Sequence, residues 1–286
     1  MLTLGKCASL EGFASMVVVW FFGVLLTSLS AMSNTQSTFY GSTYLAVTIV
    51  LFLTLLIRIM TPLTGGHLSP IVTISLCIAG LTPPLQALCY LIAQMTGATF
   101  AGILLAVSLG SRATEIENYG CYFNPTPEFN ALHVFIFEFM GAICVIAMMY
   151  GLNTSLGPQD QTYSLQINPF LNSVALGLFV FAASDFAPPK SYGGTNGFPT
   201  RCWASSVAIF KFESTDWIFW LPAMSAATLH GLAYRFLKPC VEESVVPGPS
   251  DLPNNLISNA NPSSFPPSDV IIQMGNPESS QVKEKS

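Results

Sequence analysis

Charged residues are scarce in this sequence: Asp, Glu, Lys and Arg make up 9% of its 286 residues, whereas 51% are hydrophobic. Soluble domains carry about 25% charged residues. A chain with so few charges and a mean hydropathy of +0.54 cannot cover its surface with groups that water solvates well. The composition therefore excludes an ordinary soluble domain and favours a protein that lies in a membrane.

Clusters of metal-binding or catalytic residues are also missing. The seven cysteines form no C-x-x-C pair and no metal-ligand spacing. No His/Asp/Glu cluster and no nucleophile–base pair recurs at helical spacing in the apolar runs. We therefore expect a protein that is not an enzyme and that uses no metal or other cofactor.

Six apolar runs are each close to the roughly 20 residues that cross a bilayer core. Because backbone groups in lipid must be hydrogen-bonded internally, the runs predict an all-α protein with six transmembrane helices. The first run lacks an A-x-A-like cleavage site, so we expect it to be retained. The runs cover about 13–32, 43–60, 85–109, 132–152, 170–187 and 217–237, the last interrupted by Pro222.

The residues after the last run are rich in Pro, Ser and Asn, and we predict a disordered tail over 239–286. With six spans, both termini lie on one side of the membrane. More Lys and Arg residues fall on that side, so we expect cytoplasmic termini, with the plasma membrane as the default location. That side holds Lys6, Arg58, Arg235, Lys238, Lys283 and Lys285, and the other holds Arg112, Lys190 and Lys211.

Two short segments between the runs resemble each other. TGGHLSPIVTISLCIAG (64–80) and GGTNGFPTRCWASSVAIF (193–210) each contain glycines, then X-Pro, then an apolar stretch too short to span a membrane. Proline favours the first turn of a helix and excludes the preceding residue from it. Each segment therefore predicts a loop that enters the membrane and begins a half-helix at its proline.

Further landmarks repeat at matching distances. Gly102 and Gly231 each follow the residue before the motif proline, Ser69 or Phe198, by thirty-three positions. Glu11 and Glu138 precede these positions by fifty-eight and sixty residues. We infer two related halves, about 1–109 and 131–237, within one domain over 1–238. With three spans each, the second half is inverted relative to the first, which is typical of transporters and channels.

These residues resemble the aquaporins, or major intrinsic proteins, over about 8–238. TGGHLSPIVT (64–73) is similar to the family's first signature, S-G-x-H-x-N-P-A-V-T, and GTNGFPTR (194–201) to its second, G-x-x-x-N-P-A-R. YLIAQMTGATFAG (90–102) and DWIFWLPAMSAATLHGLAY (216–234) resemble its third and last helices. Neither Asn-Pro-Ala is intact, because the chain has Ser69-Pro70-Ile71 and Phe198-Pro199-Thr200. A cysteine after Arg201 is similar to the X intrinsic proteins of fungi and plants.

The resemblance implies that the half-helices meet near the membrane centre and that a selectivity filter lies outside them. Family spacing assigns the filter to Ile49, Phe186, Thr195 and Arg201. Asp185 or Ala187 could replace Phe186, because APPKSY could contain an insertion. Ordinary packing is the alternative for the uncharged positions, and a lipid-interface arginine is the alternative for Arg201.

Other residues are expected to support the loops. The resemblance implies that Glu11 and Glu138 each accept hydrogen bonds from the backbone of a re-entrant loop or hold the turn of that loop, although Glu11 could instead lie at the membrane interface. His67 belongs to a loop that faces the cytoplasmic vestibule, with a packed histidine as the alternative. Ser69 can cap its half-helix whereas Phe198 cannot, and Asn196 is a candidate substitute. Cys121 and Cys202 are candidates for a disulfide at the outer face.

Two functions follow from the resemblance. The first is a passive channel for water and small neutral solutes such as glycerol, urea or hydrogen peroxide. The second is a non-conducting scaffold or regulator, suggested by the aromatic ring at Phe198. The resemblance also implies homotetramers, so the expected partners are the bilayer, the solutes and further copies of the chain, and no nucleic acid.

Overall fold

The computed structural model describes residues 2–33, 38–110, 121–154, 161–183, 191–193 and 198–237. Its contacts divide the chain into a unit of Met1–Lys238 and a unit of Pro239–Ser286. The predicted tail lies outside the described residues. Everything below concerns the first unit.

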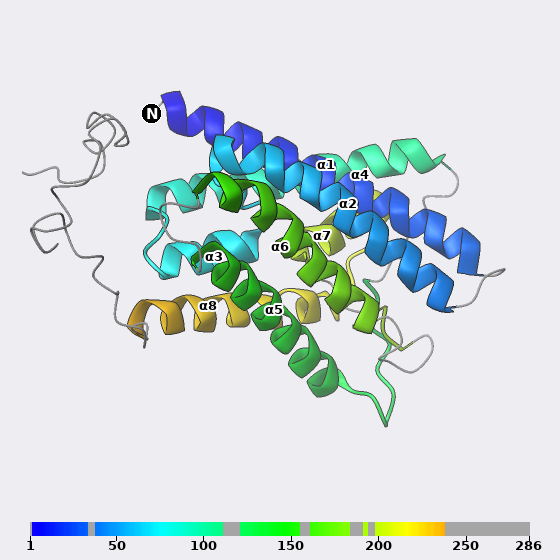
Figure 1. The fold of residues 1–286 in the computed structure, drawn as a ribbon. Coiled ribbons are helices and arrows are strands. Elements are labelled where there is room, and N and C mark those ends of the chain that lie inside the picture. The colour runs from blue at the N-terminus through cyan, green and yellow to red at the C-terminus, as the bar shows by residue number, and fades with distance from the viewer. Residues whose placement is uncertain are drawn as a thin grey trace, which may run out of the picture. The chain divides into compact units, whose positions relative to one another are not determined.

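The described part of this unit is helical (Figure 1). Phe123 and Tyr192 add an isolated antiparallel β-bridge. In chain order the helices are α1 (Leu2–Ser33), α2 (Thr38–Thr64), α3 (Pro70–Ile78), α4 (Pro84–Leu109), α5 (Ala131–Thr154), α6 (Gln161–Ala183), α7 (Pro199–Ile209), the 3₁₀ helix η3 (Asp216–Phe219) and α8 (Leu221–Phe236).

Six of the described helices lie at the six expected apolar runs. Among the described residues, four helices are long and apolar enough to cross a membrane: α1, α2, α4 and α5. α6 carries a shorter apolar stretch, Ile167–Ala183. It begins before the apolar run and continues through Pro169, whose carbonyl accepts a 2.7 Å hydrogen bond from the Ser173 hydroxyl. α8 follows η3 directly, with Pro222 in its first turn.

The two short helices begin at the predicted prolines. Pro70 opens α3 and Pro199 opens α7, in each case after a residue with extended backbone, Ser69 or Phe198. A proline lacks the N–H that the first turn leaves unpaired, and its ring disfavours helical geometry in the preceding residue. Figure 1 shows both short helices between the long ones.

The two halves pack in equivalent ways. α1 packs on α4 as α5 packs on α8, and α2 packs on α6. Each half-helix crosses to the other half, since α3 packs on α8 and α7 packs on α4. Equivalent contacts of this kind are those of an inverted repeat, with three long helices and one half-helix in each half.

Two landmark glycines explain how closely the halves approach. A Cβ atom on Gly102 would lie 2.5 Å from the Ala204 carbonyl oxygen, and one on Gly231 would lie 2.7 Å from the Ser75 carbonyl oxygen. Real Cβ contacts are essentially never below 3.0 Å. Gly102 and Gly231 therefore occupy equivalent positions, where a long helix touches the backbone of the opposite half-helix.

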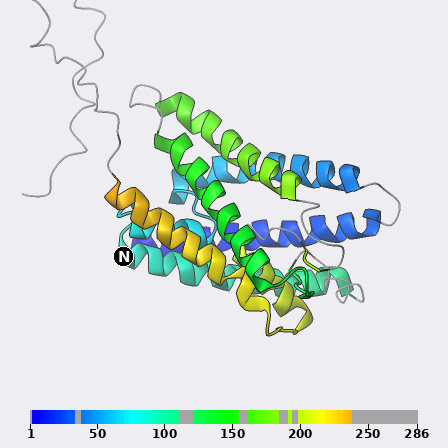
Figure 2. The ribbon, with the colours of Figure 1, turned by 90° about the horizontal axis from the view of Figure 1, so that it is seen from below.

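The first and last helices end at the same side of the bundle. In Figures 1 and 2 the N-terminal end of α1 lies at the same end as the C-terminal end of α8. Near these ends, the Cys7 thiol approaches the Leu63 carbonyl at 3.8 Å, and Arg235 Nη1 donates to the Ile78 carbonyl at 3.5 Å. Both ends lie on the same side because the chain crosses the bundle an even number of times.

Candidate functional site

Both degenerate signatures lie inside the bundle. Ser69 and Thr200 are fully buried, Pro70, Ile71 and Pro199 are buried as well, and α3 contacts α7. A helix N-terminus carries roughly half a positive elementary charge. The interior of this apolar bundle therefore contains two positive helix ends.

The first re-entrant loop is fastened to the Glu11 carboxylate of α1. The backbone N–H groups of His67 and Leu68 donate to it at 3.1 and 2.8 Å. The Thr64 hydroxyl donates at 2.5 Å and the Gln94 amide at 3.0 Å. Glu11 is completely buried, so it lies inside the protein rather than at the membrane interface, and it accepts hydrogen bonds from the loop backbone.

His67 is buried beside this network rather than open to a vestibule. Its Nδ1 lies 3.1 Å from the Thr73 hydroxyl, and its ring meets the Tyr90 ring edge-on, with centroids 5.1 Å apart. Tyr90 in turn donates to the Thr64 carbonyl at 3.0 Å. The alternative of a packed histidine is the one that the structure supports.

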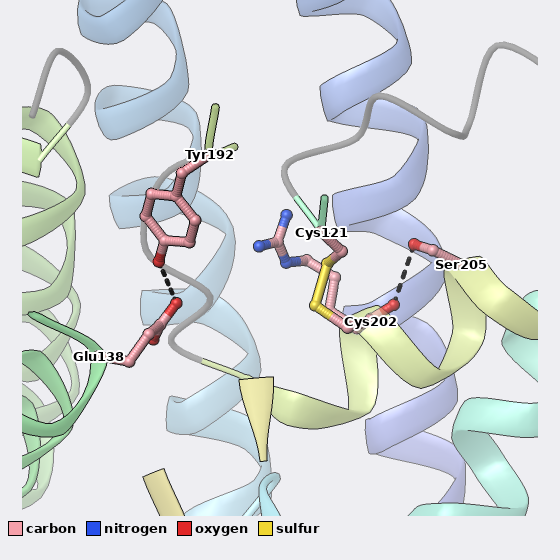
Figure 3. The surroundings of a disulfide bond; sticks show 6 residues. Cys121, Glu138, Tyr192, Cys202 and Ser205 are labelled. Atoms are coloured by element: carbon pink, nitrogen blue, oxygen red, sulfur yellow. Dashed lines mark hydrogen bonds between the residues drawn. A yellow bond between two sulfur atoms is a disulfide. The ribbon is translucent and has the colours of Figure 1, made fainter. Parts of the chain in front are cut away.

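The second loop is fastened differently. The Tyr192 hydroxyl donates to the Glu138 carboxylate, and the two side chains point toward each other in Figure 3. Tyr192 is held by its β-bridge to Phe123, with hydrogen bonds from Asn124 N to Ser191 O at 2.7 Å and from Gly193 N to Tyr122 O at 3.2 Å. Glu138 therefore supports the loop through a tyrosine side chain, a residue that the sequence interpretation missed.

A disulfide joins Cys121 to Cys202 across the start of α7, with Cα atoms 5.4 Å apart (Figure 3). This distance lies within the range that a disulfide bridges. The bond ties the segment after α4 to the first turn of α7. The free cysteines among the described residues are Cys7, Cys77, Cys89 and Cys144.

Arg201 lies in the same turn and is buried, with 7% of its surface exposed. Its N–H donates to the Phe198 carbonyl at 2.9 Å, and its carbonyl accepts from the Ser205 hydroxyl at 3.1 Å. Glu138 and Tyr192 are its electrostatic neighbours. The alternative of an arginine at the lipid interface is therefore wrong, because the side chain points into the protein.

The expectation that Ser69 caps α3 is wrong. Ser69 occupies the N-cap position, but its hydroxyl makes no capping bond. Within the described residues, neither Ser69 Oγ nor Thr200 Oγ1 has a hydrogen-bond partner, although both are buried. A buried hydroxyl without a partner costs about 1–3 kcal/mol, so both groups are suited to bind a polar molecule that enters the interior. Phe198, as expected, supplies no side-chain cap.

Comparison with known proteins gives the family. The model of the family described as "Major intrinsic protein" matches residues 4–234. The chain belongs to this family. It is an integral membrane protein with several spans, and the match covers both half-helices.

Individual members are more distant. This major intrinsic protein is 26% identical to aquaporin-5 of Sus scrofa over 187 residues, and 29% identical to aquaporin-5 of Homo sapiens over 189 residues. Each match covers 64% of this chain and 64% of the relative, so the chain spans less than two thirds of the length of these curated relatives. It is 28% identical to aquaporin TIP2-2 of Zea mays, over 68% of this chain and 71% of that one.

A solved structure supports the fold alone. The aquaglyceroporin from Plasmodium falciparum superimposes with a TM-score of 0.56 at 17% identity. The match covers 81% of this chain and 94% of that chain. The helical fold of the described residues, with six long helices and two half-helices, is therefore similar to the fold of that structure.

The structure describes two of the four residues that family spacing assigns to the filter. Ile49 is buried in α2, within an apolar cluster against which Phe198 packs. Phe186 and Thr195 lie outside the described residues, as do Asp185, Ala187 and Asn196. Of the four filter positions inferred from spacing, the structure describes Ile49 and Arg201.

Proposed function

We propose that this protein is a passive channel for water and small neutral solutes such as glycerol, urea and hydrogen peroxide. The observation that carries the proposal is the pair of half-helices that begin inside the bundle, with the hydroxyls of Ser69 and Thr200 buried at their N-terminal ends. The relatives that bear the names aquaporin and aquaglyceroporin favour the same activity.

The charge distribution suits neutral solutes. Two helix N-termini and the Arg201 guanidinium place positive potential along the interior, which repels cations while neutral molecules pass. Arg201 donates hydrogen bonds to solute oxygens in this proposal. The disulfide at Cys202 and the neighbouring Glu138 and Tyr192 hold its turn in place.

We assign the selectivity filter to Ile49, Phe186, Thr195 and Arg201, with Asp185 and Ala187 as alternatives to Phe186. Such a filter is mostly apolar with one strong forked donor. Ile49 and Arg201 are both buried, as a narrow filter requires.

A second candidate is a non-conducting family member that serves as a scaffold or regulator. It is favoured by Phe198, whose ring packs against apolar side chains where a polar residue is expected from the family signature. The absence of solute flux through a folded, reconstituted protein would support this candidate.

The cellular setting is also a proposal. Lys6, Arg58 and Arg235 lie near the helix ends that share one side of the bundle, which favours cytoplasmic termini. We place the protein in the plasma membrane, as a homotetramer with one path in each subunit. Cys202 after Arg201 supports assignment to the X intrinsic protein-like subfamily.

Solute flux tests the proposal. Purified protein reconstituted in liposomes is mixed rapidly with water, glycerol or urea gradients, and the volume change is compared with that of empty liposomes. We expect faster equilibration of at least one of these molecules, with a low activation energy and no change in ion conductance. Equal rates with and without protein would overturn the channel proposal.

A further inference from the structure

The ring of Phe198 lies where the chain enters α7. Phe198 is the N-cap residue, with φ −137° and ψ 100°, and its ring centroid is 5.6 Å from that of Phe22 in α1. The ring is partly buried rather than turned outward. It therefore extends from the beginning of the half-helix toward α1.

The surroundings of this aromatic pair belong to several helices. Phe22 and Phe198 are part of, or pack against, one apolar cluster. It includes Ile49 and Leu53 from α2, Leu176 and Val180 from α6, and Val145 from α5. A side chain at the start of α7 that shares a cluster with α1, α2, α5 and α6 lies in the interior that these helices enclose.

The aromatic pair differs in chemistry from the polar groups that lie near it in the interior. Ser69 and Thr200 place unpartnered hydroxyls at the two half-helix N-termini, and Arg201 places a guanidinium in the first turn of α7. The aromatic pair offers passing water no comparable hydrogen bond. An apolar constriction can stop conduction by excluding water even where the backbone would leave room.

We propose that Phe198 and Phe22 form a hydrophobic gate that limits permeation and slows water more than solutes that carry C–H surface. This proposal rests on the proposed channel function, and it identifies the opening of the gate as the rate-limiting step of permeation. The two rings must separate for a water molecule to pass. Solutes with C–H surface lose less on contact with the rings, so glycerol is slowed less than water.

The test replaces each ring and measures stopped-flow water and glycerol permeability per reconstituted protein. The contact between the rings must break before water passes, so its loss lowers the barrier to permeation. An aromatic contact of ordinary strength corresponds to about tenfold in rate, and we expect Phe198→Ala and Phe22→Ala each to raise water permeability by about tenfold. The ratio of water to glycerol permeability should rise as well. The double variant should exceed the single ones by little, because either change alone removes the contact.

Phe21→Ala is the matched control. Phe21 packs against the same cluster and meets the Phe22 ring edge-on with centroids 6.4 Å apart, but its ring stacks on Phe52 with centroids 3.7 Å apart. We expect this variant to keep wild-type permeability. Phe198→Leu keeps an apolar side chain but loses the aromatic contact, so its water permeability should lie between those of the wild type and Phe198→Ala. This variant provides the test if an alanine variant does not fold.

The outcomes separate the gate from the channel proposal. A wild type that conducts, with Phe198→Ala and Phe22→Ala unchanged, would overturn the gate and leave the channel. An equal rise in Phe21→Ala would also overturn it, since loosened packing rather than the pair would then control the rate. If wild type and all folded ring variants behave like empty liposomes, both proposals are wrong.

Discussion

Arg201 combines a fixed charge with a buried position. The disulfide of the adjacent Cys202 and the bonds of its own backbone hold the turn in place. We predict that Arg201→Val retains the fold, because the disulfide still holds its turn and Tyr192 still donates to the Glu138 carboxylate, but passes urea and glycerol faster relative to water. The forked donor and the local positive charge are lost. Ion leakage should stay slight, since both half-helix N-termini remain.

Stopped-flow measurements with water, glycerol and urea gradients check this prediction. Arg235→Val is the control, because Arg235 lies near the end of α8 and donates to the Ile78 carbonyl instead. Its solute ratios should equal those of the wild type. Unchanged ratios in a conducting Arg201→Val protein would remove Arg201 from the filter.

Glu11 organises the first loop through four donors, two of them backbone N–H groups. Glu11→Gln keeps the shape of the side chain but replaces the carboxylate with an amide. The amide N–H₂ cannot accept hydrogen bonds, so some of the four donors lose their acceptor. Because hydrogen bonds to charged groups contribute more than neutral ones, we predict a loss of about 3 kcal/mol in stability. The thermal unfolding midpoint in detergent should fall accordingly.

Glu213→Gln is the matched control for this change. Glu213 pairs with Lys211 at 2.9 Å, but both side chains are about half exposed, so the pair contributes less than about 1 kcal/mol. Equal midpoints for Glu11→Gln and Glu213→Gln would contradict the assigned role of Glu11.

Sequence reasoning located residues whose charge is unusual in an apolar chain and missed residues whose role depends on distant contacts. Glu11 and Arg201 were identifiable because a charge is costly in an apolar run and both match the family pattern. Tyr192 carries no such signal, since its role depends on pairing with a segment far away in the chain. Ser69 was misjudged because a capping residue type does not fix the direction of its hydroxyl.

At the scale of helices, close backbone contact joins the halves. Gly102→Ala and Gly231→Ala would each force a Cβ atom against a half-helix carbonyl, at 2.5 and 2.7 Å respectively. We predict that each variant loses about 1–3 kcal/mol through overpacking and displaces α7 or α3. Thermal unfolding in detergent and solute flux should both report the damage.

Gly5→Ala tests the same substitution where space is open. A Cβ atom on Gly5 would meet nothing within 4 Å, and the residue lies in α1. Because alanine favours a helix over glycine by about 1 kcal/mol, this variant should be slightly more stable than the wild type. A Gly102→Ala protein as stable as Gly5→Ala would show that the halves do not meet as described.

The half-helices were predictable as elements because Pro70 and Pro199 fix where each one begins. The start of α6 was not, because its first residues are polar and Pro169 lies inside it. A proline inside a helix removes one N–H and leaves the carbonyl four residues earlier without its helical donor, and transmembrane helices tolerate this where neighbouring groups satisfy that carbonyl. An apolar run therefore locates a span, but it does not show how far the helix extends beyond the run.

For the whole molecule, the sequence predicted the inverted arrangement from three matched landmarks rather than from any intact motif. The positions of Phe186 and Thr195 depend on segments between helices, where spacing alone cannot fix a side chain. The packing of Phe198 against Phe22 was likewise beyond sequence reasoning, because it joins residues of opposite halves.

The central claim is that solutes pass through the interior at the two half-helix N-termini. The most direct measurement is solute flux through Ser69→Cys liposomes before and after treatment with methyl methanethiosulfonate. Ser69 is buried at the start of α3, so a disulfide-linked methyl group there would narrow the path. We predict that labelled Ser69→Cys loses most of its flux, whereas wild type treated identically keeps it. Unchanged flux in Ser69→Cys protein whose labelling is verified by mass spectrometry would contradict the account.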